Sequence, residues 1–211
     1  MPIAVPTLEI ESQLWQQGLL RVAGVDEVGL GCLAGPIVAA AVIMPPQAPV
    51  ITGVRDSKTL SAAQRQRLLA AIQAQAIAIG VGMASVTEIE QINVLQASYR
   101  AMGRALDRVA PWNHALIDGR SIPVDLGGTV TTLIKGDRLS YVIACASIVA
   151  KVRRDRLMER LARRYPGYGW ERNAGYGTAE HRAALTQLGI TPWHRKSYAP
   201  VQQAIEQLSL F

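Results

Sequence analysis

Apolar residues recur along the chain with two different periods, which predicts strands alternating with helices. Short apolar runs predict strands over about 20–27, 37–44, 76–84, 114–119 and 129–134. Segments with apolar residues three and four positions apart predict helices over about 61–74, 88–109, 139–164, 178–188 and 199–208. A glycine-rich loop joins the first two strands without a helix between them, so we expect an antiparallel pair.

Local signals mark where several helices begin and end. Ser61 is expected to be the N-cap of the helix over 61–74, and Thr87 with Glu90 three residues later fits a capping box. Pro111 closes the helix over 88–109. Residues 1–18 are predicted to form a polar, partly helical lead-in.

The length and the apolar content bound the architecture. A chain of 211 residues with 49% hydrophobic residues can bury one sizeable core and carry an appendage. We therefore expect an α/β core over 1–164, including the lead-in, and a helical extension over 165–211 within the same compact unit.

Positive charge is concentrated in one part of the chain. The formal net charge is +6, and the segment 151–196 holds eleven Lys and Arg against four Asp and Glu. Seven of the eleven aromatic residues lie from Tyr165 onward. A basic, aromatic-rich segment suits a polyanion with stackable bases, whereas the simpler explanation is a solvated helix surface.

Other classes of protein are not favoured by the sequence. Cys32 and Cys145 lie far apart in apolar contexts, which predicts small core residues in a reducing compartment and no zinc site. The first 17 residues lack the pattern of a secretion signal, and the apolar run 37–44 is too short to span a bilayer. We expect a cytoplasmic protein without membrane association.

Carboxylates occur where two of the predicted strands end. Asp26 and Glu27 interrupt the first apolar run after Gly24, which lets another segment approach closely, and Asp118 ends the fourth strand in the same way. A buried, unpaired carboxylate is costly, so acids at the end of a core strand need a compensating cation. The simpler alternative is that these acids face water.

A fourth acid lies on the apolar stripe of the longest helix. Asp155 continues the 4-3-4-3 spacing of Tyr141, Cys145, Ile148 and Val152. Taken alone it indicates a helix acid in a salt bridge with neighbouring Lys151 or Arg154. Together with the strand-end acids it indicates a shared cluster. Oxygen ligands without His or Cys favour Mg²⁺ or Mn²⁺, and two such ions serve phosphoryl transfer, as in a nuclease or phosphotransferase.

The chain resembles the type 2 ribonucleases H (ribonuclease HII), in their bacterial form, from about residue 20 to 201. The blocks that carry this resemblance are Asp26-Glu27-Val28-Gly29-Leu30-Gly31 with Leu33-Ala34-Gly35-Pro36, Asp56-Ser57-Lys58, Ile117-Asp118-Gly119, 146–152 with Arg154-Asp155, and Gly175-Tyr176-Gly177-Thr178 with His181. The resemblance implies an α/β fold: a mixed five-stranded ribonuclease-H sheet flanked by helices, with a helical C-terminal extension.

The resemblance also implies an activity and its residues. The family's members cut RNA in RNA–DNA hybrids and cut 5′ of single ribonucleotides in duplex DNA, leaving a 3′-hydroxyl, and they are usually monomers. By this resemblance Asp26, Glu27, Asp118 and Asp155 are the catalytic acids that hold two metal ions. Substrate contacts fall on Gly29, Leu30, Gly31, Ser57, Lys58, Lys151 and Tyr176. His181 is expected at the surface or at a helix cap, and Trp193 and His194 in packing.

Two positions depart from the family pattern. Leu30 stands where the family usually has Arg, and Ala174 where a Lys commonly precedes Gly-Tyr. A second hypothesis is therefore a catalytically weakened or inactive nucleic-acid-binding homologue. A third hypothesis is a different two-metal nuclease, for example one acting on DNA junctions.

The last five residues resemble a docking peptide. Gln207, Leu208, Leu210 and Phe211 fit the pentapeptide by which many bacterial proteins bind the DNA sliding clamp. Two Leu and one Phe can enter an apolar groove. The alternative is that the last helix packs down on the protein.

Overall fold

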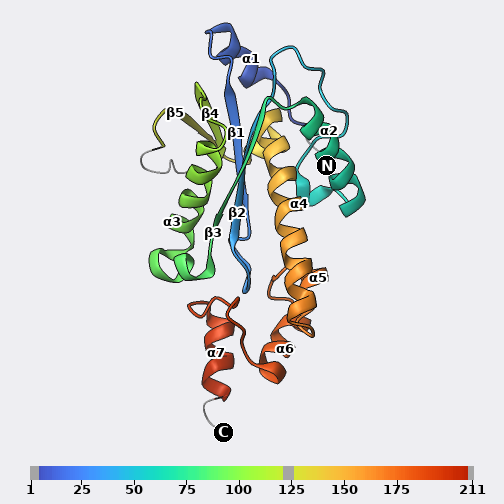
Figure 1. The fold of residues 1–211 in the computed structure, drawn as a ribbon, viewed down its shortest axis with the longest axis vertical. Helices are drawn as coiled ribbons and strands as arrows, with labels where there is room; N and C mark the ends of the chain where they lie inside the picture. The colour runs from blue at the N-terminus through green and yellow to red at the C-terminus, as the bar shows by residue number, and fades with distance from the viewer. Residues whose placement is uncertain (1–4, 121–125, 209–211) are drawn as a thin grey trace.

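A mixed five-stranded sheet with helices on both faces forms the centre of the computed structural model, which describes residues 5–120 and 126–208 (Figure 1). The strand order is β3-β2-β1-β4-β5. The strands are β1 (Val22–Val28), β2 (Ile37–Ile43), β3 (Ala78–Ala84), β4 (His114–Asp118) and β5 (Thr129–Leu133). The predicted fold class is confirmed.

Strand β1 is the point where the sheet changes from antiparallel to parallel. It pairs antiparallel with β2, as predicted, and parallel with β4. In the parallel pair Val25 lies opposite Ile117, so Asp26 and Asp118 follow at adjacent carboxyl ends. Ligand sites of open α/β sheets occur at such ends, and the register alone brings the two acids together.

The helices lie close to their predicted positions. They are α1 (Glu9–Gln16), α2 (Ala62–Gln75), α3 (Val86–Asp107), α4 (Tyr141–Arg164), α5 (Trp170–Asn173), α6 (Ala179–Leu188) and α7 (Ala199–Leu208), with short 3₁₀ turns η1 (Ser57–Thr59) and η2 (Gly136–Arg138). The single turn α5 was not predicted. Among the described helices, none has both the length and the apolar character needed to cross a bilayer.

Alternate residues of the central strands pack on opposite faces of the sheet. Val22 and Val38 contact the core beneath α4, whereas Ala23, Val25 and Ile37 belong to the core beneath α3. All of β2 is buried. This two-sided burial explains why the sequence of β2 is a continuous apolar run rather than an alternating one.

Helix α3 differs from its prediction at its start and in its middle. The capping box is formed by Ser85 and Glu88, not by Thr87 and Glu90. The carboxylate of Glu90 instead accepts hydrogen bonds from Ser197. The helix is also kinked at Asn93, whose φ is 65°. The kink shifts the phase of the apolar stripe, so Leu95 is exposed rather than packed.

The N-terminal lead-in docks onto the start of α4. Glu11 of α1 is fully buried, and one of its carboxylate oxygens accepts hydrogen bonds from the Ser140 hydroxyl at 2.6 Å and the Val142 N–H at 3.0 Å. An acid at a helix N-terminus is stabilised by the free N–H groups and the helix dipole. The lead-in therefore positions α4, which carries Lys151 and Asp155.

The C-terminal elements gather at the end of the sheet where β1 and β2 are joined (Figure 1). Leu33 of this connection packs with Leu185 of α6 and Val201 of α7, and Ala34 belongs to a second cluster with Met158 and Trp170. The glycine-rich loop is thus enclosed by apolar contacts from segments that follow it by more than a hundred residues.

Gly24→Ala is expected to destabilise the protein by about 3 kcal/mol, because overpacking of a rigid contact is costly. A Cβ at position 24 would lie 2.2 Å from the Val142 carbonyl carbon of α4, which confirms the predicted close approach at this glycine. Urea unfolding at constant m-value measures the loss.

Gly103→Ala is the matched control, because position 103 lies inside α3 and a Cβ there meets, among the described residues, only Leu126 at 3.4 Å. It is expected to raise stability by about 1 kcal/mol through helix propensity. Equal effects of the two substitutions would contradict this packing of β1 on α4.

Candidate nucleic-acid and metal site

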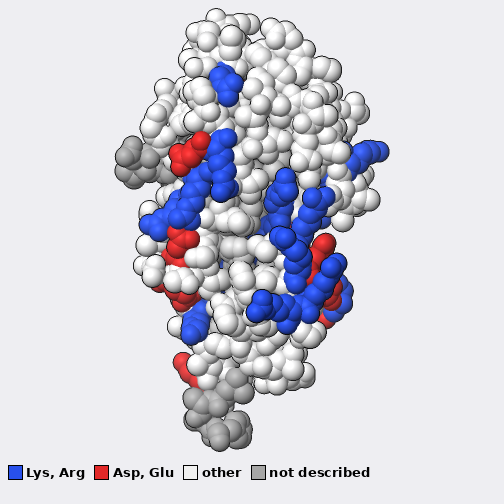
Figure 2. Space-filling view, viewed as in Figure 1, with Lys and Arg blue, Asp and Glu red and all other residues white. Residues whose placement is uncertain are grey.

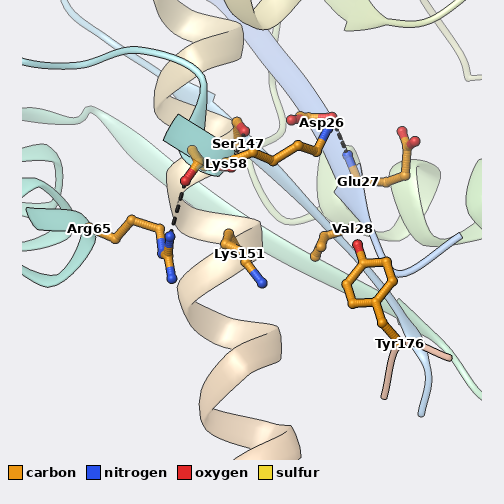
Figure 3. Close-up of a pocket in the computed structure, with 9 residues that line it drawn as sticks. Asp26, Glu27, Val28, Lys58, Arg65, Ser147, Lys151 and Tyr176 are labelled. Atoms are coloured by element: carbon orange, nitrogen blue, oxygen red, sulfur yellow. Dashed lines mark hydrogen bonds between the residues drawn. The ribbon is translucent and has the colours of Figure 1, made fainter. Parts of the chain in front are cut away.

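A pocket of about 410 Å³ opens at the carboxyl end of β1 (Figure 3). Side chains from β1, η1, α2, α4 and the loop after α5 line it. They are Asp26, Glu27, Val28, Ser57, Lys58, Arg65, Ser147, Lys151 and Tyr176. Of the residues predicted from the sequence, the structure therefore places both β1 acids, both lysines, Ser57 and Tyr176 around one cavity.

Three carboxylates are held close enough to perturb one another. Burial and the charges of Glu27 and Asp118 raise the pKa of Asp26 well above its usual range. Burial and the charge of Asp118 raise the pKa of Glu27 to about 7. Burial also raises the pKa of Asp118, although the Gly136 N–H donates to its Oδ1 at 2.7 Å. Desolvated acids of like charge favour a cation between them.

Asp155 lies on the pocket side of α4 but is paired with cations. Lys151 Nζ lies 2.7 Å from its Oδ1, and Arg65 Nη2 lies 3.4 Å from its Oδ2. This is the salt-bridged arrangement that the helix alone indicates, although its partners are Lys151 and Arg65 rather than Arg154. The structure brings three of the four predicted acids together and leaves the fourth beside them in ion pairs.

The donor chemistry of the site fits a hard divalent ion. All the candidate ligands are carboxylate oxygens, the type that Mg²⁺ and Mn²⁺ prefer. Across residues 5–120 and 126–208, however, no three His, Cys, Asp or Glu side chains already surround one point as ligands. Release of Asp155 from Lys151 and Arg65 would make a further carboxylate available to an ion beside Asp26 and Glu27.

Lys58 and Ser57 reach the pocket from the 3₁₀ turn η1. The turn is fixed by Asp56, whose Oδ1 accepts the Lys58 N–H at 2.9 Å. In Figure 3 the Lys58 side chain runs toward Asp26. Burial lowers the pKa of Lys58, but the charges of Asp26 and other acids outweigh this and raise it overall. The Ser57 hydroxyl is 2.7 Å from that of Ser147, and both residues are buried.

The glycine-rich loop exposes Leu30 and Gly31 beside the acids, whereas Gly29 is buried. Gly29 has a φ of 107°, which favours glycine, and no atom of the described residues lies within 4 Å of a Cβ built at Gly31. The Leu30 side chain is 37% exposed, whereas its carbonyl accepts hydrogen bonds from Arg195 and Tyr198. Cys32 forms an isolated antiparallel bridge with Tyr176, so the loop and the tyrosine are neighbours.

Tyr176 projects from a firmly held backbone. Its ring is partly accessible, and the residue is 39% exposed. Its N–H donates to the Asn173 carbonyl at 2.9 Å, and His181 Nδ1 lies 2.9 Å from its carbonyl oxygen.

The expectation that His181 lies at the surface or serves as a cap is wrong, because its ring is completely buried against Trp170 and His194. The predicted packing role of His194 is confirmed.

The hydrogen bonds of the two histidines define their tautomers. The Thr191 N–H donates to His194 Nδ1 at 2.8 Å, so His194 carries its proton on Nε2. That nitrogen lies 3.1 Å from His181 Nε2, which therefore accepts and also receives the Trp170 N–H at 3.0 Å. His181 Nδ1–H is then the donor to the Tyr176 carbonyl. Two neutral rings thus form a buried relay that ends at Tyr176.

Several polar and charged residues near the site were not singled out from the sequence. Arg65 and Ser147 line the pocket, while Asp137 and Arg138 of η2 lie next to it through Asp56. Burial and the charges of Asp56 and Asp118 raise the pKa of Asp137 to about 6. The strand-then-Asp pattern after β5 and the helical spacing of Ser147 from Lys151 are signals that would have found two of these residues.

Residues 23–201 match the family model described as Ribonuclease HII. The chain belongs to the ribonuclease HII family. It is 66% identical to "Ribonuclease HII" of Thermosynechococcus vestitus, over 91% of this chain and 90% of that protein. It is 55% identical to "Ribonuclease HII" of Rhodospirillum rubrum, over 90% and 89%.

A solved structure shares the fold of this ribonuclease HII family member. In the PCNA:RNase HII complex from Archaeoglobus fulgidus, the matched chain is 27% identical with a TM-score of 0.73, and the match covers 85% of this chain and 95% of that one. The family recognised in the sequence is confirmed, and with it the enzyme class, a metal-dependent ribonuclease H. The family model and both relatives span the acids, the glycine loop and Tyr176 together.

Acidification from pH 7 to pH 5 is expected to destabilise the protein through the histidine relay. Burial and the neighbouring His181 lower the pKa of His194 to about 3, and burial lowers that of His181. Below about pH 6.5 the unfolded chain binds protons that the folded protein does not bind. The free energy of unfolding therefore decreases as the pH is lowered. The loss through His194 is about 2 kcal/mol at pH 5.

Urea unfolding of the wild type and of His194→Gln at both pH values measures how much His194 contributes to this loss of stability. The variant should lose less stability on acidification than the wild type does. The buried acids titrate in the opposite sense in both proteins and cancel in the comparison. Identical pH dependence of the two proteins would contradict neutral, buried rings at His181 and His194.

Proposed function

We propose that this protein is an endonuclease that hydrolyses the RNA strand of RNA–DNA hybrids. It also cuts on the 5′ side of single ribonucleotides embedded in duplex DNA and leaves a 3′-hydroxyl. One observation carries the proposal: Asp26 and Glu27, whose charges repel each other and that of Asp118, line a pocket with Lys58, Lys151 and the accessible ring of Tyr176. Acids for metal, cations for phosphate and a ring for the sugar therefore meet at one place.

The four acids would hold two divalent ions, Mg²⁺ or Mn²⁺. Asp26, Glu27 and Asp118 lie near one another, and Asp155 would join them on leaving Lys151 and Arg65. When bound, such ions activate water and stabilise the departing 3′-oxygen.

Partner exchange at Asp155 links metal binding to substrate binding. In the structure Lys151 and Arg65 neutralise Asp155. When this carboxylate turns to a metal, both cations become available for substrate phosphates, with Lys58 and Ser57 on the facing turn. Arg65 would then contact substrate phosphates in addition to Ser57, Lys58 and Lys151, the contacts inferred from the sequence.

Backbone and tyrosine would read the sugar. Gly29 and Gly31 offer N–H groups without side chains in the way, and Tyr176 lies beside them. The 2′-hydroxyl distinguishes RNA from DNA at a given site. The side chain of Leu30 points to solvent, so the loop backbone is formed without an arginine at that position.

A basic surface next to the pocket would bind the rest of the duplex. Lys and Arg side chains gather over α4 in Figure 2, and Arg153, Arg156 and Arg160 line a hollow on this helix. Phosphate contacts from such residues supply sequence-independent affinity. We expect the protein to act as a monomer on duplexes.

Asp118→Asn is expected to lower cleavage about 10²–10³-fold or more, the effect of removing one preorganised electrostatic group. The substrate is a labelled DNA duplex with one ribonucleotide, incubated with Mg²⁺ or Mn²⁺ beside an all-DNA duplex. Wild-type protein should cut 5′ of the ribonucleotide and leave the all-DNA duplex intact.

Asp107→Asn serves as the matched control, since Asp107 is an exposed aspartate at the end of α3. It should cut like the wild type. Absence of cleavage by the wild type, with binding to the duplex retained, would favour the inactive-binder alternative. Substantial cutting of the all-DNA duplex would favour a different two-metal nuclease.

We also propose that residues 207–211 dock on the DNA sliding clamp. The related archaeal protein was solved as a complex with PCNA, which supports a clamp partner. Helix α7 packs on the protein through Val201 and Ala204, while Gln207 at its end is exposed. The side chain of Leu208 and residues 209–211, including Leu210 and Phe211, lie outside the described residues.

Removal of residues 207–211 is expected to abolish binding to the bacterial sliding clamp, measured by surface plasmon resonance, and to leave cleavage unchanged. A variant with the same five residues in scrambled order controls for composition and should bind as poorly as the truncation. Undiminished clamp affinity of the truncated protein would refute the docking proposal.

A further inference from the structure

Arg154 is a completely buried residue of α4 whose guanidinium binds three backbone carbonyls. Nε donates to Pro36 O at 3.0 Å, Nη2 to Ala34 O at 3.0 Å and Nη1 to Ala174 O at 2.7 Å. Pro36 and Ala34 close the glycine-rich loop, whereas Ala174 stands two residues before Tyr176. One side chain therefore ties together the two segments expected to read the sugar.

The same side chain supports the loop from beneath. A Cβ built at Gly29 would lie 2.5 Å from Arg154 Nε, and one at Gly35 would lie 3.2 Å from Nη2. Arg154 is thus in contact with the loop at both of its ends. The glycines allow the guanidinium to approach the backbone closely, which a side chain at either position would prevent.

Direct hydrogen bonds complete the junction between the two segments. The N–H groups of Leu33 and Ala34 donate to the Gly175 carbonyl at 2.8 and 3.3 Å. Ala174 is held in a left-handed conformation with a φ of 48°, an unfavourable conformation for alanine. The hydrogen bond from Arg154 to the Ala174 carbonyl helps to maintain it.

We propose that Arg154 is a positioning residue for ribonucleotide selectivity. It fixes the spacing between the Gly29–Gly31 backbone and Tyr176, and this spacing decides whether a 2′-hydroxyl is recognised. The inference rests on the proposed reading of the sugar by these groups. Reading one hydroxyl requires its partners to be held within about 0.5 Å, so loosening the junction should cost selectivity.

The proposed role separates selectivity from affinity. The cations proposed to meet phosphates, Lys58 and Lys151, stand on η1 and on α4, whereas Arg154 binds the carbonyls of Ala34, Pro36 and Ala174. Substitution of Arg154 should therefore leave the affinity for an all-DNA duplex unchanged. A lysine cannot replace the guanidinium, because its single ammonium lacks the planar fork that holds three carbonyls.

The experiment measures binding in the Asp118→Asn background, where cleavage does not interfere. Dissociation constants are determined with Mg²⁺ for an all-DNA duplex and for the same duplex with one ribonucleotide, and their ratio gives the selectivity. Arg154→Met and Arg154→Lys should both lower this ratio about tenfold, the value of one hydrogen bond. Arg108→Met, which removes an exposed positive charge at the end of α3, is the control and should leave it unchanged.

The outcomes distinguish the positioning role of Arg154 from the proposed recognition of the sugar on which it rests. Equal affinity of the parent protein for both duplexes would overturn the proposed reading of the sugar, and this inference with it. Selectivity in the parent that survives both Arg154 substitutions would overturn the positioning role alone. A similar loss of selectivity in Arg108→Met would also overturn it, because loss of one positive charge would then be the cause.

Hydrogen exchange provides a second test if Arg154→Met does not fold. In Arg154→Lys the amides of Leu33 and Ala34, which bridge the two segments, should exchange about tenfold faster, while those of Ala40 and Ala41 in β2 stay protected. Uniform acceleration in both places would reduce Arg154 to a residue of general stability and overturn the proposal.

Discussion

The structure depends on holding the carboxylates of buried Asp26 and half-buried Glu27 and Asp118 close together. Their mutual repulsion and desolvation oppose folding, as the raised pKa values of all three acids indicate. The parallel pairing of β1 with β4 enforces the proximity, and burial of the strands under α3 and α4 offsets its cost. A site that strains the metal-free protein in this way gains stability when a divalent ion binds.

Charge balance around these acids explains the composition of the pocket. Lys58 lies against the acids of β1, while Lys151 and Arg65 neutralise Asp155. Asp155 is therefore balanced by two cations, whereas Lys58 alone does not offset the charges of Asp26, Glu27 and Asp118. Arrival of metal ions and a phosphodiester adds charges of both signs, so the acids and the cations can exchange partners without leaving a buried charge alone.

The sequence was sufficient for features that depend on neighbours along the chain. Apolar runs and helical spacing located the strands and long helices, and the acids at strand ends indicated the metal chemistry. Features that depend on contacts across the fold were missed or misplaced. Ser85 with Glu88 and Thr87 with Glu90 carry the same capping signal, and only the packing of α3 selects the first. His181 and His194 become a relay because α6 and the segment after it fold against Trp170.

Arg154 illustrates why spacing along a helix does not predict where a side chain points. Its position next to Asp155 indicates a salt bridge with that acid, yet the side chain points toward the β1–β2 loop. Arg195 joins it there by donating to the carbonyls of Leu30 and Gly35. Two buried guanidinium groups thus lie beneath a loop whose exposed residue is leucine. Buried charges are screened by salt far less than exposed ones, so the positive potential under the loop persists at ionic strengths that would weaken an arginine at position 30.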